Sequence, residues 1–173
     1  MNNEVCFNQE SLIKIDDMVI DNLKNLARKN NSGKYRLCLH HNPQDNLHEM
    51  FIVCSKGGYI RPGKHLNTTE SHTIIDGAML VIIFEENGQI REVFEVSKEK
   101  YHTYRIDTDT YHMQIPLTEQ VVYYEVRLGP FTDKGNVFPN WAPDPRDTEN
   151  VRVYMEGMKK RIHDFVGAKG SVL

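Results

Sequence analysis

The chain has 173 residues, with a hydrophobic content of 39% and a charged content of 26%, which are ordinary values for one soluble globular domain. Its net charge is −3 and its basic residues are scattered, so we expect neither nucleic acid nor a membrane surface as a partner. Three cysteines without a CxxC pair argue against a disulfide framework and favour a reducing compartment. The chain shows no signal-peptide pattern and no apolar run long enough to span a bilayer, so we expect a cytoplasmic protein.

The first predicted element is an amphipathic helix over about Ser11–Lys29. Its apolar residues recur near helical spacing from Leu12 to Leu26, while Asp and Lys occupy the other faces. The turn-forming run Asn30–Gly33 predicts the end of this helix.

The next part of the chain, from Tyr35 to Leu128, alternates short stretches rich in Val, Ile, Tyr, Phe and Thr with turn signals. The clearest pair is a hairpin, in which residues 78–84 connect through Asn87-Gly88 to the run Ile90–Val96. Strands at regular spacing, with no helices between them, predict an antiparallel sandwich or barrel.

After Gly129-Pro130 a proline-rich stretch precedes a second predicted helix, over about Asp147–Val166. No linker is long enough to separate two domains. We therefore predict a single domain, with an N-terminal helical segment at 1–33, a β-barrel at 35–130 and a proline-rich tail with a C-terminal helix at 131–173.

Histidines and carboxylates gather on predicted strand faces, because side chains at i and i+2 share one face of a strand. The groups that share a face are Tyr59, Arg61, Gly63 and His65; Glu70 and His72; His112 and Gln114; and Tyr123, Glu125 and Arg127. If these faces point into the barrel, they bury imidazoles and carboxylates in its core. Such groups are unfavourable in a dry core unless each has a partner. A divalent metal satisfies two imidazoles and a carboxylate together.

The spacing Gly57-x5-Gly63-x-His65-x4-Glu70-x6-Gly77 resembles the first sequence motif of the cupins, and Asp107–His112 resembles the second. This resemblance implies an all-β fold, the cupin-type antiparallel β-barrel (jelly roll), with a helix at each end of the chain. It also implies a divalent metal ion (Zn, Fe, Mn or Ni) bound by His65, Glu70 and His112.

The chain is further similar to the WbuC family, cupin-fold metalloproteins associated with O-antigen and other surface-polysaccharide gene clusters. The likeness covers most of the chain and includes the N-terminal helix, the Tyr59–Pro62 segment, the Leu128–Phe131 segment and the Trp141–Pro143 segment. It implies a small sugar-like ligand. Small cupins also commonly pair, so we expect a homodimer.

The chain departs from the family pattern at Gly63, where the family has a histidine. Three outcomes follow physically: His72 replaces the missing ligand, water or a substrate oxygen fills the position, or the metal is lost. The family also has a Gln-Arg pair before this strand, and this chain has His48-Glu49 in its place. This replacement changes the substrate contacts that the resemblance implies.

Three functions fit these features. The first is a metal-dependent protein that binds or converts a carbohydrate or nucleotide sugar, as an isomerase, epimerase or lyase does. Its proton-transfer candidates are Tyr111, Tyr123 and Glu125, and its substrate-pocket candidates are Tyr59, Arg61 and Gln114. The second is a metal-free sugar isomerase or epimerase with His65 or His112 as the base. The third is a non-catalytic module that senses a ligand.

Overall fold

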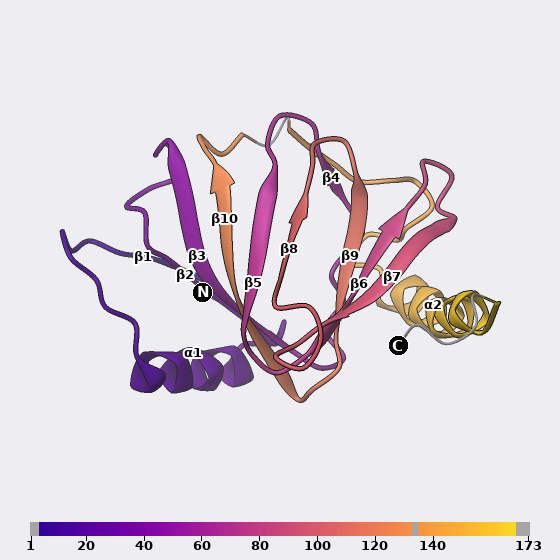
Figure 1. Cartoon of the computed structure of the whole chain (residues 1–173), viewed down its shortest axis with the longest axis horizontal. Helices are drawn as coiled ribbons and strands as arrows, with labels where there is room; N and C mark the ends of the chain where they lie inside the picture. Colours follow the sequence, from indigo (N-terminus) through magenta and orange to yellow (C-terminus); the bar gives the residue numbers. More distant parts are fainter. Residues whose placement is uncertain (1–3, 133–134, 169–173) are drawn as a thin grey trace.

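Two β-sheets face each other in the computed structural model, which describes residues 4–132 and 135–168 (Figure 1). The six-stranded sheet has the strand order β1-β2-β3-β10-β5-β8, and the three-stranded sheet has the order β7-β6-β9. A short pair, β11-β4, forms a two-stranded sheet of its own. The strands are β1 (Val5–Phe7), β2 (Lys34–Cys38), β3 (Leu47–Ser55), β4 (Lys64–His65), β5 (Glu70–Asp76), β6 (Met79–Phe84), β7 (Ile90–Val96), β8 (Thr103–Ile106), β9 (Tyr111–Pro116), β10 (Gln120–Leu128) and β11 (Asn136–Val137).

The inner faces of the two sheets enclose the main hydrophobic core. Alternate residues of each strand point inward, so β3 contributes Met50 and Ile52 while β6 contributes Met79 and Val81. Apart from the parallel pair β1–β2, the described pairs of named strands are antiparallel. The chain therefore has the β-sandwich form of the cupin fold, and the predicted fold class is confirmed.

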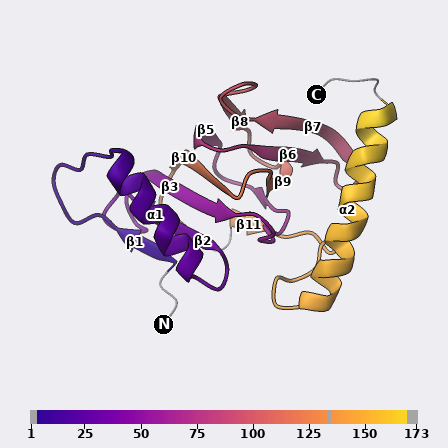
Figure 2. The ribbon, with the colours of Figure 1, turned by 90° about the horizontal axis from the view of Figure 1, so that it is seen from below.

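Helix α1 (Asp17–Lys29) covers the outer face of the six-stranded sheet (Figure 2). Its buried residues Ile20 and Leu23 belong to the same hydrophobic cluster as Val53 and Val122, and each such buried side chain stabilises the fold by about 1.5–3 kcal/mol. The predicted start at Ser11 is wrong. The Asp16 side chain accepts a hydrogen bond from the Val19 amide and caps the helix there.

Two apolar residues of the predicted helix are exposed. Leu12 precedes the helix and is 71% exposed, and Met18 lies in its first turn and is 79% exposed. Neither residue therefore contributes to the contact between α1 and the sheet.

Helix α2 (Thr148–Ala168) covers the outer face of the three-stranded sheet, where Met158 packs with Phe84 and Met113 (Figure 2). Its bounds agree with the predicted helix to within two residues at each end. The predicted hairpin is also confirmed, as β6 and β7, and Gly88 in its turn has a φ of 82°.

Two short strands alter the predicted division of the chain. Strand β1 lies in the segment predicted to be only helical, and it pairs in parallel with β2. Strand β11 lies in the predicted tail and pairs with β4, the strand that carries His65. Within the described residues, neither helix combines the length and the apolar content needed to cross a bilayer.

Candidate functional site

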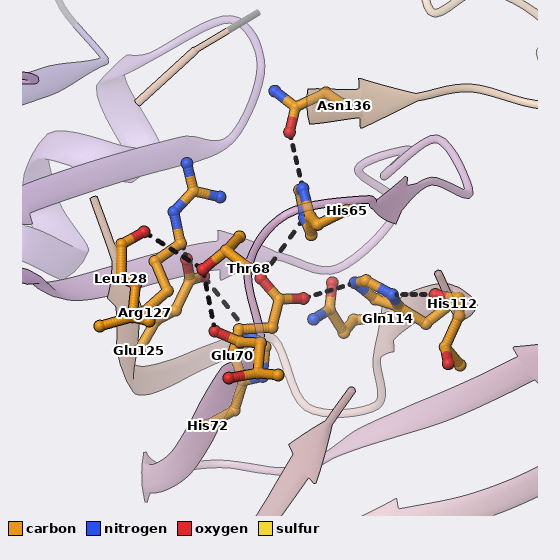
Figure 3. A network of polar contacts seen from close by, with 12 residues as sticks. His65, Thr68, Glu70, His72, His112, Gln114, Glu125, Arg127, Leu128 and Asn136 are labelled. Atoms are coloured by element: carbon orange, nitrogen blue, oxygen red, sulfur yellow. Dashed lines mark hydrogen bonds and ion pairs between the residues drawn. The ribbon is translucent and has the colours of Figure 1, made fainter. Parts of the chain in front are cut away.

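Three of the predicted metal ligands converge at one end of the barrel interior. The His112 Nε2 atom lies 2.8 Å from Glu70 Oε1, and the His65 Nε2 atom lies 3.4 Å from Glu70 Oε2 (Figure 3). One ligand atom from each residue lies within 4.8 Å of the others. Glu70 is 4% exposed, so its carboxylate is almost removed from water. We call this group the Glu70 cluster.

Strand pairing brings the three residues together. Gly63 and His112 form an antiparallel bridge, in which each backbone amide donates to the other's carbonyl at 3.1 and 3.0 Å. This bridge ties β9 to the segment that leads into β4 and His65. Glu70 comes from the opposite sheet, at the start of β5, so the cluster joins the two sheets at this end of the barrel.

Each imidazole of the cluster is oriented through its other ring nitrogen. His65 Nδ1 lies 2.6 Å from Asn136 Oδ1, and His112 Nδ1 lies 3.0 Å from the Thr110 carbonyl oxygen. Both partners are acceptors, so both Nδ1 atoms carry the hydrogen and donate it. A neutral ring of this tautomer presents a lone pair at Nε2, which here faces the Glu70 carboxylate. Only a proton or a metal cation makes that arrangement favourable.

Burial and charge act in opposite directions on the cluster. Burial lowers the pKa of His65. Burial also opposes the charged form of His112, but the neighbouring Glu70 carboxylate outweighs it and raises the pKa of that imidazole. For Glu70 itself, burial favours the neutral acid, while the nearby His112 and His72 imidazoles lower its pKa below the ordinary value. The carboxylate is therefore ionised at neutral pH.

His72 belongs to a second group behind Glu70. Its Nε2 atom lies 3.2 Å from Glu125 Oε2, and its ring stacks on Tyr104 with centroids 4.8 Å apart. Ligand atoms of Glu70, His72 and Glu125 also lie within 4.8 Å of one another. His72 is only 1% exposed and its Nε2 atom is bound to Glu125. It therefore orients the Glu125 carboxylate and is not directed at the two imidazoles of the Glu70 cluster.

The three proton-transfer candidates lie in different places. Glu125 is buried on the inner face beside His72. Tyr123 lies one inward position further along β10, where it lines a separate cavity of about 140 Å³ together with Lys34, Cys54 and Ile60. Tyr111 packs in the outer cluster against Trp141, with ring centroids 5.7 Å apart. Only Glu125 therefore stands close to the Glu70 cluster.

The three substrate-pocket candidates also lie in different parts of the structure. Gln114 is buried on the inner face and donates to the Tyr104 hydroxyl at 3.0 Å. The Tyr59 hydroxyl instead donates to the Pro143 carbonyl oxygen at 3.1 Å. Arg61 donates to the Ala142 carbonyl oxygen at 3.0 Å and lies over the Phe138 ring. The polar groups of Tyr59 and Arg61 thus hold the C-terminal segment.

Phe138 also fills the space beside Gly63. A Cβ atom added at Gly63 would lie 3.3 Å from Cε1 of the Phe138 ring. The position at which the resemblance to the WbuC family predicts a histidine is therefore covered in this chain by an aromatic ring.

Two further residues at the site were not identified as candidates from the sequence. Asn136 lies outside the predicted barrel, and only the pairing of β11 with β4 brings it to His65. Arg127 shares the inner face of β10 with Glu125 and is the cross-strand partner of Glu70. The alternation of β10 gave a signal for Arg127, and no local pattern marks Asn136.

Comparison with known proteins supports the fold. A family model described as a domain of unknown function (DUF6016) matches residues 15–96, and no curated protein matches the chain in sequence. The capsular polysaccharide assembling protein CapF from Staphylococcus aureus superposes with a TM-score of 0.51 and 15% identity, over 74% of this chain and 34% of that chain. CapF bound to the inhibitor 3-isopropenyl-tropolone gives a TM-score of 0.50 and 16% identity, over 60% of this chain and 31% of that chain.

A third solved structure, KdgF from Halomonas sp., has a TM-score of 0.46 and 17% identity, over 58% of this chain and 83% of that chain. This chain thus spans about a third of the length of the CapF chains that it matches. At such identities the likeness concerns the fold alone.

Proposed function

We propose that this protein is a metal-binding cupin that binds or converts a small sugar-like molecule. The observation that carries the proposal is the Glu70 cluster, in which two imidazole Nε2 atoms and a buried carboxylate converge while both Nδ1 atoms are already committed to acceptors. Three protein ligands with an open position are typical of catalytic metal centres.

The residues fit a divalent cation. Glu70 Oε1 is buried and has no hydrogen-bond partner within the described residues, although His112 Nε2 is only 2.8 Å away. At this distance the carboxylate oxygen and the imidazole lone pair repel each other unless a proton or a metal cation lies between them. A carboxylate and two imidazoles that converge in this way are suited to a common cation.

A bound divalent cation would polarise a carbonyl or hydroxyl group of the ligand, or activate water. The chain's own residues have separate roles in this proposal. Asn136 and the Thr110 carbonyl fix the two imidazole rings, as the outer partners of metal-binding histidines do. Glu125, held by His72, is the candidate nearest the cluster for moving a proton.

The sugar-like ligand is inferred from analogy. The sequence resembles the WbuC family of surface-polysaccharide gene clusters, and the fold is similar to that of CapF, which is described as assembling capsular polysaccharide. Because unrelated functions share this fold, the analogy supports a role in surface-polysaccharide biosynthesis without specifying the reaction.

Elemental analysis tests the metal. We expect the purified protein to hold a divalent metal in stoichiometric amount, and EDTA to remove it. His112→Ala loses most of this metal, because it removes one coordination bond and leaves the cation under-neutralised. His102→Ala is the matched control, since His102 is exposed and lies outside both carboxylate groups. Equal metal content in the wild type and in His112→Ala would contradict the proposal.

One observation favours the metal-free isomerase as a second candidate. The Glu70 carboxylate raises the pKa of His112, as a carboxylate does for an imidazole that serves as a general base. In that case the wild type holds no metal, and His112→Ala abolishes turnover of a nucleotide sugar without changing the metal content.

The homodimer expected from the resemblance is part of this proposal. Strands β1 and β8 form the two edges of the six-stranded sheet, and an open sheet edge favours pairing with a second chain. Light scattering at micromolar concentration tests the dimer, and a monomeric mass would contradict it.

A further inference from the structure

Arg127 stands beside the Glu70 cluster on the inner face of the barrel. In the strand register it is the partner of Glu70 on one side and of His48 on the other. Side chains of such cross-strand partners lie on the same face, about 5 Å apart at Cβ. The Arg127 side chain is only 12% exposed, so its charge is largely removed from water.

The guanidinium has no hydrogen-bond acceptor within the described residues. The nearest carboxylate oxygen, Glu125 Oε1, lies 4.0 Å from Nε, which is beyond hydrogen-bond distance, and Nε is buried without a partner. Figure 3 shows the terminal nitrogens directed away from Glu125, with no contact drawn to them. An arginine offers five N–H donors, and buried donors are almost always bonded. The terminal nitrogens are not among the buried atoms that lack a partner, so they are open to an acceptor from outside the described chain.

The surroundings of Arg127 favour an anion with a carbon-rich body. The Phe131 ring lies 5.4 Å from the guanidinium carbon and covers it. Phe131 is partly exposed at this end, and the Leu128 carbonyl accepts a hydrogen bond from Thr68 in the loop that leads to Glu70. An exposed aromatic ring of this kind suits the C–H face of a sugar ring.

Charge points to the same class of ligand. The divalent metal proposed for the Glu70 cluster would bring two positive charges next to that of Arg127, and the ionised Glu70 and Glu125 offset two of these three charges. A planar, bidentate acceptor such as a carboxylate or phosphate neutralises a guanidinium best and also suits a cation beside it.

We propose that Arg127 is the anion-binding residue of this site, and that the ligand is an acidic sugar, which bears a carboxylate or a phosphate. This inference rests on the proposed function for the identity of the site, but it depends on Arg127 itself rather than on the metal ligands.

Calorimetric titration with three sugars tests the inference: glucuronate, glucose 1-phosphate and uncharged glucose. The wild type, with the metal it holds when purified, binds at least one of the two anionic sugars and binds glucose at least tenfold more weakly. Arg127→Gln loses about tenfold to a hundredfold in affinity for the anion, the usual value of a charged hydrogen bond. Arg127→Lys keeps the charge but not the bidentate geometry, so it retains part of the affinity.

Arg105→Gln is the matched control, because Arg105 is 61% exposed in its side chain and lies 3.7 Å from Asp107 on the outside of β8. We expect its affinities to remain within twofold of the wild type. The relative affinity of the two anionic sugars distinguishes a carboxylate from a phosphate. Equal binding of glucose and the anions, no anion binding by the wild type, or anion binding that Arg127→Gln leaves unchanged would each overturn the inference.

Metal content and thermal unfolding, measured on the same preparations, separate this inference from the proposed function. Arg127→Gln retains the wild-type metal content, since Arg127 is not a ligand. A metal-free wild type with Arg127-dependent anion binding would contradict the proposed function and support the anion site. A metal-containing wild type whose anion binding does not depend on Arg127 would contradict only the anion site.

Discussion

The two ends of the barrel interior are built by the same strands but differ in character. On β5 the inward residues run from Glu70 and His72 to Ile74, and on β10 they run from Arg127 to Val121. One end thus contains carboxylates, imidazoles and a guanidinium, whereas the other packs Ile74 and Val121 with Met79 and Val96. The register between β5 and β10 runs across the two ends with one shift, at Val122/Tyr123, so the difference between the ends is mainly in their side chains.

This contrast separates stability from function within one fold. Burying the apolar end lowers the free energy of the folded state. Burying carboxylates and imidazoles raises it unless every group is paired. A chain under selection for stability alone would not place Glu70 and Glu125 inside the barrel. We therefore assign stability mainly to the apolar end and ligand chemistry to the polar end.

The largest expected effect comes from the apolar end. Met79→Ala, at a fully buried position, costs about 2–5 kcal/mol of unfolding free energy, because it removes buried surface and leaves a cavity. Glu70→Gln in the EDTA-treated protein costs less, because glutamine has nearly the size of glutamate and leaves no cavity, and its amide keeps hydrogen-bonding atoms at the same place. Urea denaturation of both variants checks the contrast. An equal loss of stability in both would show that the two ends do not divide the roles.

The next-largest expected effect is on metal affinity and comes from His72. Because its Nε2 atom is bound to Glu125, we expect His72 to position the second carboxylate rather than to replace the missing metal ligand. Glu125 is not one of the three proposed ligands, so His72→Ala weakens metal affinity by less than the about 10–100-fold that loss of a ligand's direct outer partner causes. A competition titration with a chromophoric chelator compares His72→Ala with His112→Ala and with the His102→Ala control. If His72→Ala removes as much metal as His112→Ala, His72 is itself a ligand.

The two ends are also expected to differ in how the unfolding free energy depends on acidic pH. Burial disfavours the ionised form of Glu125, but the contact with His72 and the charges of Arg36 and Arg127 outweigh it and lower its pKa to about 2. A carboxyl whose folded pKa is depressed stabilises the fold above its unfolded pKa, near 4.5, and that contribution is lost as the pH falls toward 2.

Glu125→Gln therefore reduces the pH dependence of the unfolding free energy between about pH 4.5 and pH 2, by up to ~1.4 kcal/mol per pH unit in metal-free protein. Asp76→Asn is the comparison variant. Asp76 pairs with Lys24 at a more exposed site, so its removal changes the slope less. Identical slopes for the wild type and Glu125→Gln would show that this carboxyl is not linked to folding.

The smallest expected effect is at Gly63. A histidine placed there meets the Phe138 ring, so Gly63→His alone leaves metal affinity almost unchanged. Combined with Phe138→Ala, which frees the space, the same histidine adds a ligand and tightens binding, by about tenfold if it contributes ~1.4 kcal/mol. Phe138→Ala alone is the control. A double variant no tighter than this control would show that position 63 does not face the metal.

Comparing the predicted site residues with their positions in the structure shows which features the sequence predicts. The motif spacing identified His65, Glu70 and His112, and the structure brings them together. Strand alternation places Tyr111 on the opposite face from His112, because neighbouring residues of a strand face opposite sides, so this pattern argues against Tyr111 as a site residue.

Contacts between distant segments could not be predicted in this way. No local pattern indicates that Asn136 meets His65, because the pairing of β11 with β4 depends on where the chain returns. The Phe138 ring over Gly63 is hidden from the sequence for the same reason. The start of α1 was misplaced because Leu12 and Ile15 extend the apolar spacing beyond the Asp16 cap.

The hydrogen bond from His65 to Asn136 also makes the three donors depend on a distant part of the chain. The two residues are 71 positions apart, and only the pairing of β11 with β4 brings them together. Because a domain folds as a unit, the ring of His65 is oriented only in a chain that includes β11. A chain cut short before Asn136 would therefore contain all three donor residues without the contact that orients the first of them.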